Sequence, residues 1–470
     1  MGVKWNRYLL LLATILLLCS CALTPVPQAT YVDPGATLHL YLQPLPQEAH
    51  QLSLTVAGLS ARTADGRDIP LLTEPWVLNP TERIGRQTKL LQQKLPVGEY
   101  FGLSLELAAA TLQTEEGPID LLVDAGPQLI SENFFISADQ TQALFLALQP
   151  ERLVTGGYKL TAQFSLWKAQ TPLAELQGII SHPNSGVLTV FEKKTPTLVE
   201  LIAVGREPDG VALDQRGRLA YLALSGENSI VVFDLVRGKV QRKIRLQTGD
   251  RPTELALSAD GATLISLNSG SNSVSIIGTD SFSERRRLLF STTPAGIFTG
   301  ANNRNAYVSL PDINALALLD LERDVVVATA NLTDTATRGV ADRTGRHIYL
   351  LTENSPNLLV VSADNLALTE RVYIGYGARC LALNPNNALL YVGMQSGEIA
   401  VIDPRVGLPI DSFNAAPGIV DITVDREENS LFVVSTQGNL LSKYDLISKK
   451  RLAVLELGTA GAKIAVMGER

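Results

Sequence analysis

Cysteine and histidine are scarce in this sequence. Three cysteines and four histidines occur in 470 residues, and no two of the histidines, at positions 39, 50, 182 and 347, have metal-ligand spacing. Zinc and haem sites call for spacings such as HxxxH, CxxC or CxxCH. We therefore expect no metal and no cofactor. We also expect His182 and His347 to lie at the surface of their domain.

The familiar catalytic motifs are missing as well. The sequence has no G-x-S-x-G nucleophile elbow, phosphate-binding loop, dinucleotide fingerprint or EF-hand spacing in a fitting context. These absences disfavour an enzyme without excluding one. They leave no residue that we can assign as catalytic.

Excess positive charge is also lacking. The formal net charge is −7, and because residues 1–20 hold Lys4 and Arg7 but no acid, the remainder carries −9. An acidic chain argues against nucleic acid as a partner. With 46% hydrophobic and 19% charged residues, the composition is that of a globular protein.

The first 20 residues have the pattern of a targeting segment. A basic start precedes an apolar run from Tyr8 to Leu18 that is too short to cross a bilayer comfortably. The run ends in Leu18-Cys19-Ser20-Cys21, which resembles the lipobox of bacterial lipoproteins. That resemblance implies a signal peptide over 1–20, acyl chains such as palmitate on Cys21, and a tether over 21–35. Cys19 is a weaker alternative site of lipidation. The alternative to a lipoprotein signal is an ordinary secretory signal with incidental cysteines.

The same resemblance implies a location. Ala22 follows the cysteine where retention in the inner membrane would usually want Asp, so we expect an outer-membrane lipoprotein that faces the periplasm or the cell surface. Of the three cysteines only Cys380 would then remain free, so no intramolecular disulfide can form. We expect Cys380 to be a small buried residue.

A repeat of about 42 residues dominates the chain from 175 to 470. Its marker is an aromatic or aliphatic residue in the second strand of each unit, and successive markers are 44, 42, 42, 42 and 41 residues apart. The markers are Tyr221, Ile265, Tyr307, Tyr349, Tyr391 and Phe432. Four strand-like runs per unit at this period predict a β-propeller. Asp234, Asp320, Asp403 and Asp445 follow the third strands, where we expect them to form turns.

The chain ends predict seven blades. Residues 175–192 align with 217–234 but have no first strand before them, and residues 463–466 match the first strand at 210–213. We therefore expect strand exchange between residues 175–204 and 462–467 to close a seven-bladed ring. Such closure removes free strand edges.

The repeats resemble a known class of propeller. The stretches ALDQRGRLAYLA (212–223) and ALNPNNALLYVG (382–393) are similar to the YVTN repeats of bacterial and archaeal surface and periplasmic propellers. The Trp-Asp pair of WD40 repeats is absent. The YVTN resemblance implies an architecture and not a reaction.

Residues 36–170 lie outside this repeat and form an expected second domain. Short alternating runs separated by Gly, Pro and Asp predict a β-sandwich. The segment LPVGEYFGLSLEL resembles the strand start of an uncharacterised β-sandwich domain common in bacterial surface lipoproteins. The fold class is thus all-β, an N-terminal β-sandwich followed by the propeller.

Charged residues recur in the loops that lead into the first strands. First strands of a propeller run nearest the axis, so these loops should surround one mouth of the channel. The candidates are Arg206, Arg251, Glu254, Arg338, Arg379, Asp421 and Lys463. Such a funnel could hold an anionic or zwitterionic group through charge-assisted bonds. The alternative is that these charges only solvate loop ends or pair with each other.

Two functions remain open from the sequence. The favoured one is a membrane-anchored binding or scaffold module for a protein or an extracellular ligand. The other is a periplasmic or surface hydrolase of the lactonase type that works from the channel mouth.

Overall fold

The computed structural model describes residues 37–79, 85–138, 141–149, 153–168 and 173–468. The predicted lipidation site Cys21 and the tether over 21–35 lie outside these residues. Strands make up 60% of the structure and helix 3%. The helical part consists of single turns, at η1 (Gln47–Ala49), η3 (Ala174–Leu176), η4 (Ser225–Glu227) and η5 (Pro311–Ile313).

The described N-terminal residues form two large sheets around a shared apolar core and a small two-stranded sheet, β10-β11. One has the order β3-β2-β6-β7, with β4 paired to β2 and β8 to β6, and the other begins β12-β9-β1-β5. Leu54 of β2 and Leu103 of β6 pack in one cluster with Leu38 of β1 and Leu144 of β9. The strands are β1 (Thr37–Leu42), β2 (Leu52–Thr63), β3 (Asp68–Pro70), β4 (Trp76–Leu78), β5 (Arg86–Lys94), β6 (Gly98–Thr114), β7 (Gly117–Leu121), β8 (Gln128–Ile136), β9 (Thr141–Leu148), β10 (Val154–Thr155), β11 (Lys159–Leu160) and β12 (Phe164–Trp167).

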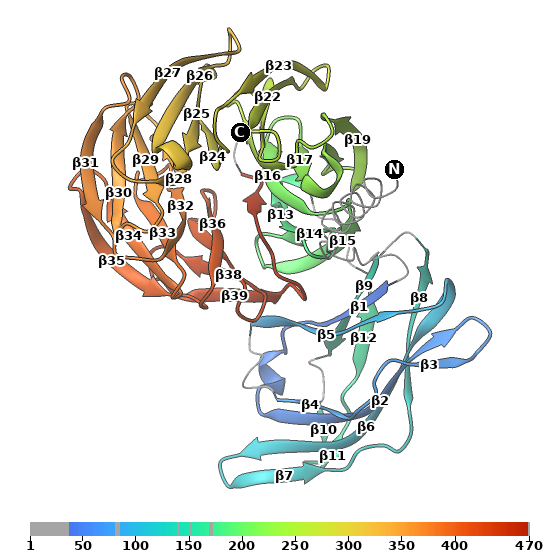
Figure 1. Ribbon diagram of the computed structural model, residues 1–470. Helices are drawn as coiled ribbons and strands as arrows, with labels where there is room; N and C mark the ends of the chain where they lie inside the picture. The colour runs from blue at the N-terminus through green and yellow to red at the C-terminus, as the bar shows by residue number, and fades with distance from the viewer. Residues whose placement is uncertain (1–36, 80–84, 139–140, 150–152, 169–172, 469–470) are drawn as a thin grey trace, which may run out of the picture. The chain divides into compact units, whose positions relative to one another are not determined.

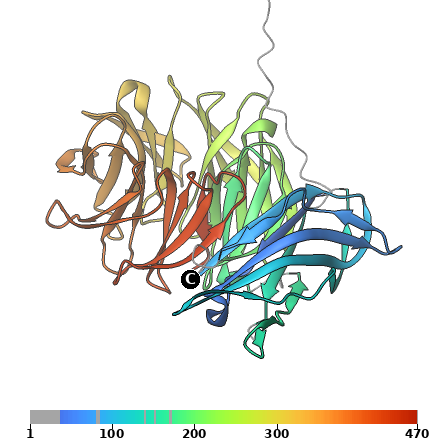
Figure 2. The same cartoon turned by 90° about the horizontal axis from the view of Figure 1, so that it is seen from below.

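From residue 208 the chain repeats one antiparallel sheet of four strands, paired in chain order. Figure 1 shows these sheets side by side around a centre, and Figure 2 shows them turned by 90°. This arrangement is consistent with the β-propeller that the 42-residue period predicts. The sheets are β16 to β19 (Pro208–Asp214, Leu219–Leu224, Ser229–Asp234, Lys239–Arg245), β20 to β23 (Pro252–Leu257, Thr263–Asn268, Ser273–Gly278, Ser283–Leu289), β24 to β27 (Gly296–Thr299, Asn305–Leu310, Ala315–Asp320, Val325–Asn331), β28 to β31 (Ala336–Ala341, His347–Thr352, Asn357–Ser362, Leu368–Tyr373), β32 to β35 (Ala378–Leu383, Leu390–Met394, Glu398–Asp403, Leu408–Asn414) and β36 to β39 (Ile419–Asp425, Ser430–Ser435, Leu440–Asp445, Arg451–Glu456).

A further four-stranded sheet combines segments from distant parts of the chain. Its order is β15-β14-β13-β40, from β13 (Gln177–His182), β14 (Val187–Glu192), β15 (Thr197–Ala203) and β40 (Ile464–Val466). The C-terminal β40 is antiparallel to β13, and Ile464 faces Ile180 in the register. The last strand of the chain therefore occupies the position that a first strand has in the other repeats.

One repeat sheet also continues into the N-terminal part. Strand β39 pairs in parallel with β5, with Leu455 opposite Gln87, and this makes an eight-stranded sheet. The Gln87 Oε1 atom accepts a hydrogen bond from the backbone of Leu198 at 2.8 Å, and Arg86 forms an ion pair with Glu456 at 2.5 Å. Nothing in the 42-residue period predicts this pairing.

The sequence markers have the local roles expected of them. The second-strand markers are all buried, and Tyr221 and Phe432 have no exposed surface. The Oδ1 atom of Asp234 accepts hydrogen bonds from the backbone of Val236 and Arg237, both at 2.9 Å. Asp320, Asp403 and Asp445 bind following backbone N–H groups in the same way. Cys380 is buried, as predicted, and burial raises the pKa of its thiol.

The prediction for His182 is wrong. This side chain is buried, its Nδ1 atom lies 3.2 Å from the carbonyl oxygen of Ala460, and its Nε2 atom lies 2.7 Å from Thr189 Oγ1. The segment before β40 covers it. His347 is more exposed, and its Nδ1 atom lies 3.3 Å from Asp342 Oδ2.

Candidate functional site

Two sets of loops meet at one end of each repeat sheet. The first and second strands are antiparallel, so the loop before the first strand and the loop after the second lie together. Backbone bonds join them, from Glu353 N to Thr335 O at 2.8 Å and from Thr436 N to Gly418 O at 2.9 Å. These paired loops hold the candidate site in place.

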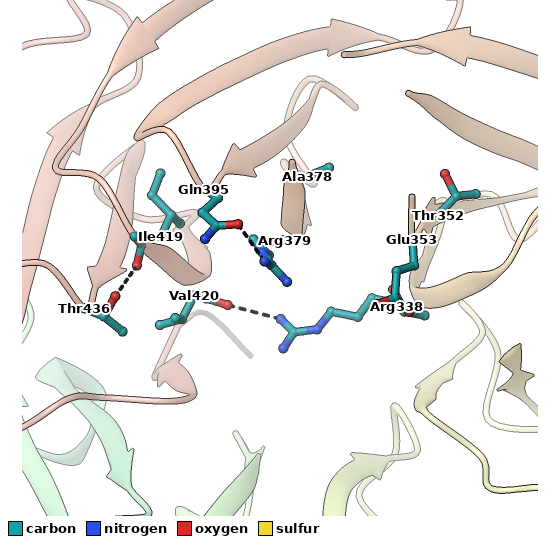
Figure 3. Close-up of a pocket in the computed structure, with 11 residues that line it drawn as sticks. Arg338, Thr352, Glu353, Ala378, Arg379, Gln395, Ile419, Val420 and Thr436 are labelled. Carbon is teal, nitrogen blue, oxygen red and sulfur yellow. Dashed lines mark hydrogen bonds between the residues drawn. The ribbon is translucent and has the colours of Figure 1, made fainter. Parts of the chain in front are cut away.

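A cavity of about 440 Å³ lies at this end and spans three consecutive sheets, β28–β31, β32–β35 and β36–β39. We call it the mouth pocket. Figure 3 shows the side chains of Arg338 and Arg379 extending into it. It is lined by Thr337, Arg338, Thr352, Glu353, Ala378, Arg379, Gln395, Gly418, Ile419, Val420 and Thr436.

Arg338 joins the mouth pocket to a smaller cavity of about 140 Å³, here called the inner chamber. Its Nη1 atom lies 3.3 Å from the carbonyl oxygen of Val420 and 3.4 Å from Asp421 Oδ1. Burial opposes the charge on this guanidinium, but Asp421 and Glu254 outweigh it and raise the Arg338 pKa. The inner chamber is lined by Glu254, Gly296, Ile297, Arg338, Gly339, Leu381, Asp421 and Lys463.

Arg379 is the less compensated cation of the mouth pocket. Its Nη2 atom donates to Gln395 Oε1 at 2.6 Å, and its side chain is exposed. Within the described ranges no carboxylate forms an ion pair with it. Among the lining residues that the structure describes, only Glu353 carries a carboxylate. The Arg379 guanidinium is therefore available to an anion.

Opposite charges alternate inside the inner chamber. Lys463 Nζ lies 2.5 Å from Glu254 Oε1, and Asp421 Oδ2 accepts a hydrogen bond from the backbone of Ile464 at 3.0 Å. Burial raises the pKa of Asp421. Nearby, burial and then the charge of Glu254 raise the pKa of Asp209 to about 6. Removing a cation here would leave carboxylates uncompensated, so these charges pair with each other instead of only solvating loop ends, both of which the sequence left open beside the funnel.

The structure brings five of the seven predicted residues together. Arg338 and Arg379 line the mouth pocket, and Glu254, Asp421 and Lys463 line the inner chamber with Arg338. The other two line neither cavity, which differs from the expectation of one common funnel. Arg251 lies 3.6 Å from Glu207, and Arg206 is exposed, with its backbone N–H bonded to Glu227. Glu207 belongs to the loop before β16 and Arg251 to the loop before β20, so an acid of the neighbouring loop engages Arg251.

Sequence reasoning missed the residues supplied by the second loop of each sheet. Glu353, Gln395 and Thr436 each follow a second-strand marker by four positions. The sequence contains this offset. Because the first strand starts at the mouth and the second strand is antiparallel to it, the residues that follow the second strand must lie at the mouth. The missed side chains add an amide, a carboxylate and a hydroxyl to the two arginines.

The side chains of the mouth pocket include groups of a kind that can bind an anion. Guanidinium groups present several N–H donors in a fixed plane and bind carboxylate or phosphate oxygens in pairs. Thr337, Thr352, Thr436 and Gln395 add neutral polar groups around them. In the described part of the chain there is no cluster of three or more His, Cys, Asp or Glu residues that could hold a metal ion. Among the same residues, no helix is long and apolar enough to cross a membrane.

Comparison with known proteins supports the fold. No protein family and no curated protein matches the sequence. Among solved structures, hydrazine synthase of Kuenenia stuttgartiensis matches 57% of this chain and 91% of its own, at 16% identity and a TM-score of 0.52. The dihydro-heme d1 dehydrogenase NirN in complex with DHE matches 64% of this chain and 77% of its own, at 14% identity and a TM-score of 0.51. At these identities the likeness shows the β-propeller fold alone.

Proposed function

We propose that this chain is a lipid-anchored binding protein whose propeller holds an anionic group of a ligand or partner protein in the mouth pocket. The observation that carries the proposal is the pair of arginines there. Arg338 is partly engaged by Asp421, whereas among the described residues Arg379 has only the neutral Gln395 as a partner. An incoming carboxylate or phosphate would supply the missing charge.

A hydrolase of the lactonase type is the second candidate. Asp209 favours it, because a carboxyl group with a pKa of about 6 could exchange protons near neutral pH. However, Asp209 lines neither the mouth pocket nor the inner chamber. A general base must reach the substrate proton, so the geometry favours binding over hydrolysis.

We also propose the finer architecture. The propeller has seven blades of the YVTN type, closed where β40 completes the sheet of β13, β14 and β15. The pairing of β40 with β13 and the repeated four-stranded sheets support this closure. The N-terminal part is a β-sandwich, supported by the core that its two sheets share. In this arrangement the sandwich is a spacer or docking domain.

The proposed anchor is Cys21 in the outer membrane. Changing Cys21 to Ser should yield a soluble or unprocessed protein, because the thiol would carry the lipids. Partitioning between detergent and aqueous phases measures this. If the Cys21→Ser variant still enters the detergent phase, processed at the same size, Cys21 is not the lipidated residue.

The mouth pocket is tested with simple anions. Citrate, succinate and tri-glutamate should raise the melting temperature of the purified protein in a nonionic detergent, since a ligand stabilises the state that binds it. Arg379→Gln should weaken binding by about 1–3 kcal/mol, the scale of a charge-assisted hydrogen bond. Arg379 is the residue to change because its removal leaves no buried carboxylate behind.

Arg343→Gln is the matched control. Arg343 belongs to the same blade as Arg338 but lies beyond the far end of β28, where its Nη1 atom is 3.4 Å from the carbonyl oxygen of Pro385. The Arg343→Gln variant should bind the anions as the wild type does. Equal losses in both variants, or no anion-dependent stabilisation in the wild type, would reject the mouth pocket as an anion site.

A further inference from the structure

Positive charge is concentrated on the outer strands of two neighbouring blades. Strand β19 reads KVQRKIR and β23 reads SERRRLL, which gives seven cations and one acid. Other outer strands differ, since β27 reads VVVATAN with no charge and β35 reads LPIDSFN with one acid. The whole chain has a net charge of −7. The cations of β19 and β23 are therefore a local feature, here called the basic edge.

Part of this charge is already balanced by acids. Lys243 pairs with Glu227, Arg285 with Asp324, and Arg287 with Asp250 and Glu284. Burial raises the pKa of Glu200, and the charge of Lys239 offsets part of that rise. Arg242, Arg245 and Arg286 are exposed, and no acid among the described residues forms an ion pair with them. The basic edge thus keeps three free guanidinium groups.

The two strands of the basic edge are joined by a side-chain contact. The Arg242 guanidinium lies over the ring of Phe282, just before β23, at 5.1 Å from its centroid. A cation held on an aromatic face is oriented while it keeps its charge. Val240 of β19 and Leu289 of β23 are exposed beside these cations. The edge therefore combines fixed positive charge with apolar side chains.

We propose that the basic edge docks on a bilayer that carries anionic phosphate head groups. Lys and Arg near such a surface each add attraction, and apolar neighbours can enter the head-group region. A simpler role for the charge is to keep an exposed strand edge from pairing with other molecules. That role would require charge on the outer strand β27 as well, but β27 has no charged residue. No residue of β19 or β23 lines the mouth pocket, so docking at this edge leaves the pocket open. The inference depends neither on Cys21 nor on the anion site.

The test is flotation of the full-length Cys21→Ser chain with vesicles of phosphatidylcholine alone and of phosphatidylcholine mixed with phosphatidylglycerol. The ratio of the two partition coefficients isolates charge, and Lys4 and Arg7 of the N-terminal segment contribute equally to it in every variant. The ratio should be well above one and fall towards one at high salt. Changing Arg242, Arg245 and Arg286 together to Gln should lower it by about tenfold or more.

A matched control removes the same charge elsewhere. Changing Arg323, Arg343 and Arg346 together to Gln, on other blades, should leave the ratio unchanged. If the test variant melts at a lower temperature, the Arg245→Gln/Arg286→Gln pair keeps the contact with Phe282 and should still lower the ratio. An equal fall in the control, or a wild-type ratio near one, overturns the proposal. Salt-sensitive binding to dextran sulfate with a vesicle ratio near one would assign the edge to an acidic polymer instead.

Discussion

Deletion of residues 462–470 should destabilise the propeller severely. This segment contains β40, which pairs with β13, and it buries Ile464, Val466 and Met467 with 7%, 9% and 1% of their surface exposed. Burial of a large apolar side chain contributes about 2 kcal/mol, so three contribute about 6 kcal/mol. A whole domain is stable by only about 5–15 kcal/mol, so the loss is of the same order as the total.

Polar contacts increase that cost. Lys193 has 1% of its side chain exposed, and its Nζ atom donates to the carbonyl oxygen of Met467 at 2.6 Å. Asp421 would lose the backbone N–H of Ile464, and Glu254 would lose Lys463. Buried charges without partners are costly. The deletion also exposes the edge of β13, which could then pair with other molecules.

Thermal melts and size-exclusion chromatography measure the effect. Deletion of 462–470 should give aggregates or a large fall in melting temperature. Deletion of 468–470 is the control, because it removes only one described hydrogen bond, from Gly468 N to Gln215 Oε1 at 2.8 Å, worth about 1 kcal/mol. A melt unchanged by the longer deletion would refute closure of the ring by β40.

Two further predictions concern pH. Asp209→Asn should raise the melting temperature at pH 7 and have no effect near pH 4. The pKa of the wild-type carboxyl rises from 3.8 to about 6 on folding, so the wild-type protein loses up to about 3 kcal/mol of unfolding free energy as pH rises through that interval. A gain in melting temperature that persists at pH 4 would contradict burial as the cause. His182→Gln should lose less stability than the wild type as pH falls from about 6.5 to about 4. Burial lowers the pKa of His182 from 6.5 to about 4, so below 6.5 the unfolded chain binds a proton that the folded one excludes, again at a cost of up to about 3 kcal/mol. Parallel urea titrations of both proteins across this range measure the difference, and identical slopes would count against the buried imidazole.

Local sequence signals predicted the repeat better than they predicted the site. Marker residues such as Tyr221 and turn formers such as Asp234 act within a few positions of themselves, so their spacing was enough. The position of an arginine side chain depends on which acids surround it. Arg251 and Arg379 occupy similar loops, yet Glu207 lies beside the first and the neutral Gln395 beside the second. No periodicity encodes that difference.

Apart from the predicted pairing of 462–467 with 175–204, contacts between distant segments were also beyond the sequence. His182 was predicted to be exposed because no partner lies at metal-ligand spacing from it, but Thr459 and Ala460 cover it from the other end of the chain. The pairing of β5 with β39 likewise joins residues that share no repeat. The offset of four positions that leads to Glu353 and Gln395, by contrast, was present in the sequence and could have been used.

We expect Arg338 and Arg379 together to hold an anion in the mouth pocket. A crystal of the protein soaked in selenate tests this directly, since the anomalous signal of selenium locates the anion independently of the side chains around it. A selenium peak should lie in the mouth pocket, with selenate oxygens about 2.7–2.9 Å from nitrogens of both guanidinium groups, and it should be lost in Arg379→Gln. A mouth pocket without selenium while other sites on the protein are occupied, or a peak that persists unchanged in Arg379→Gln, would contradict this expectation.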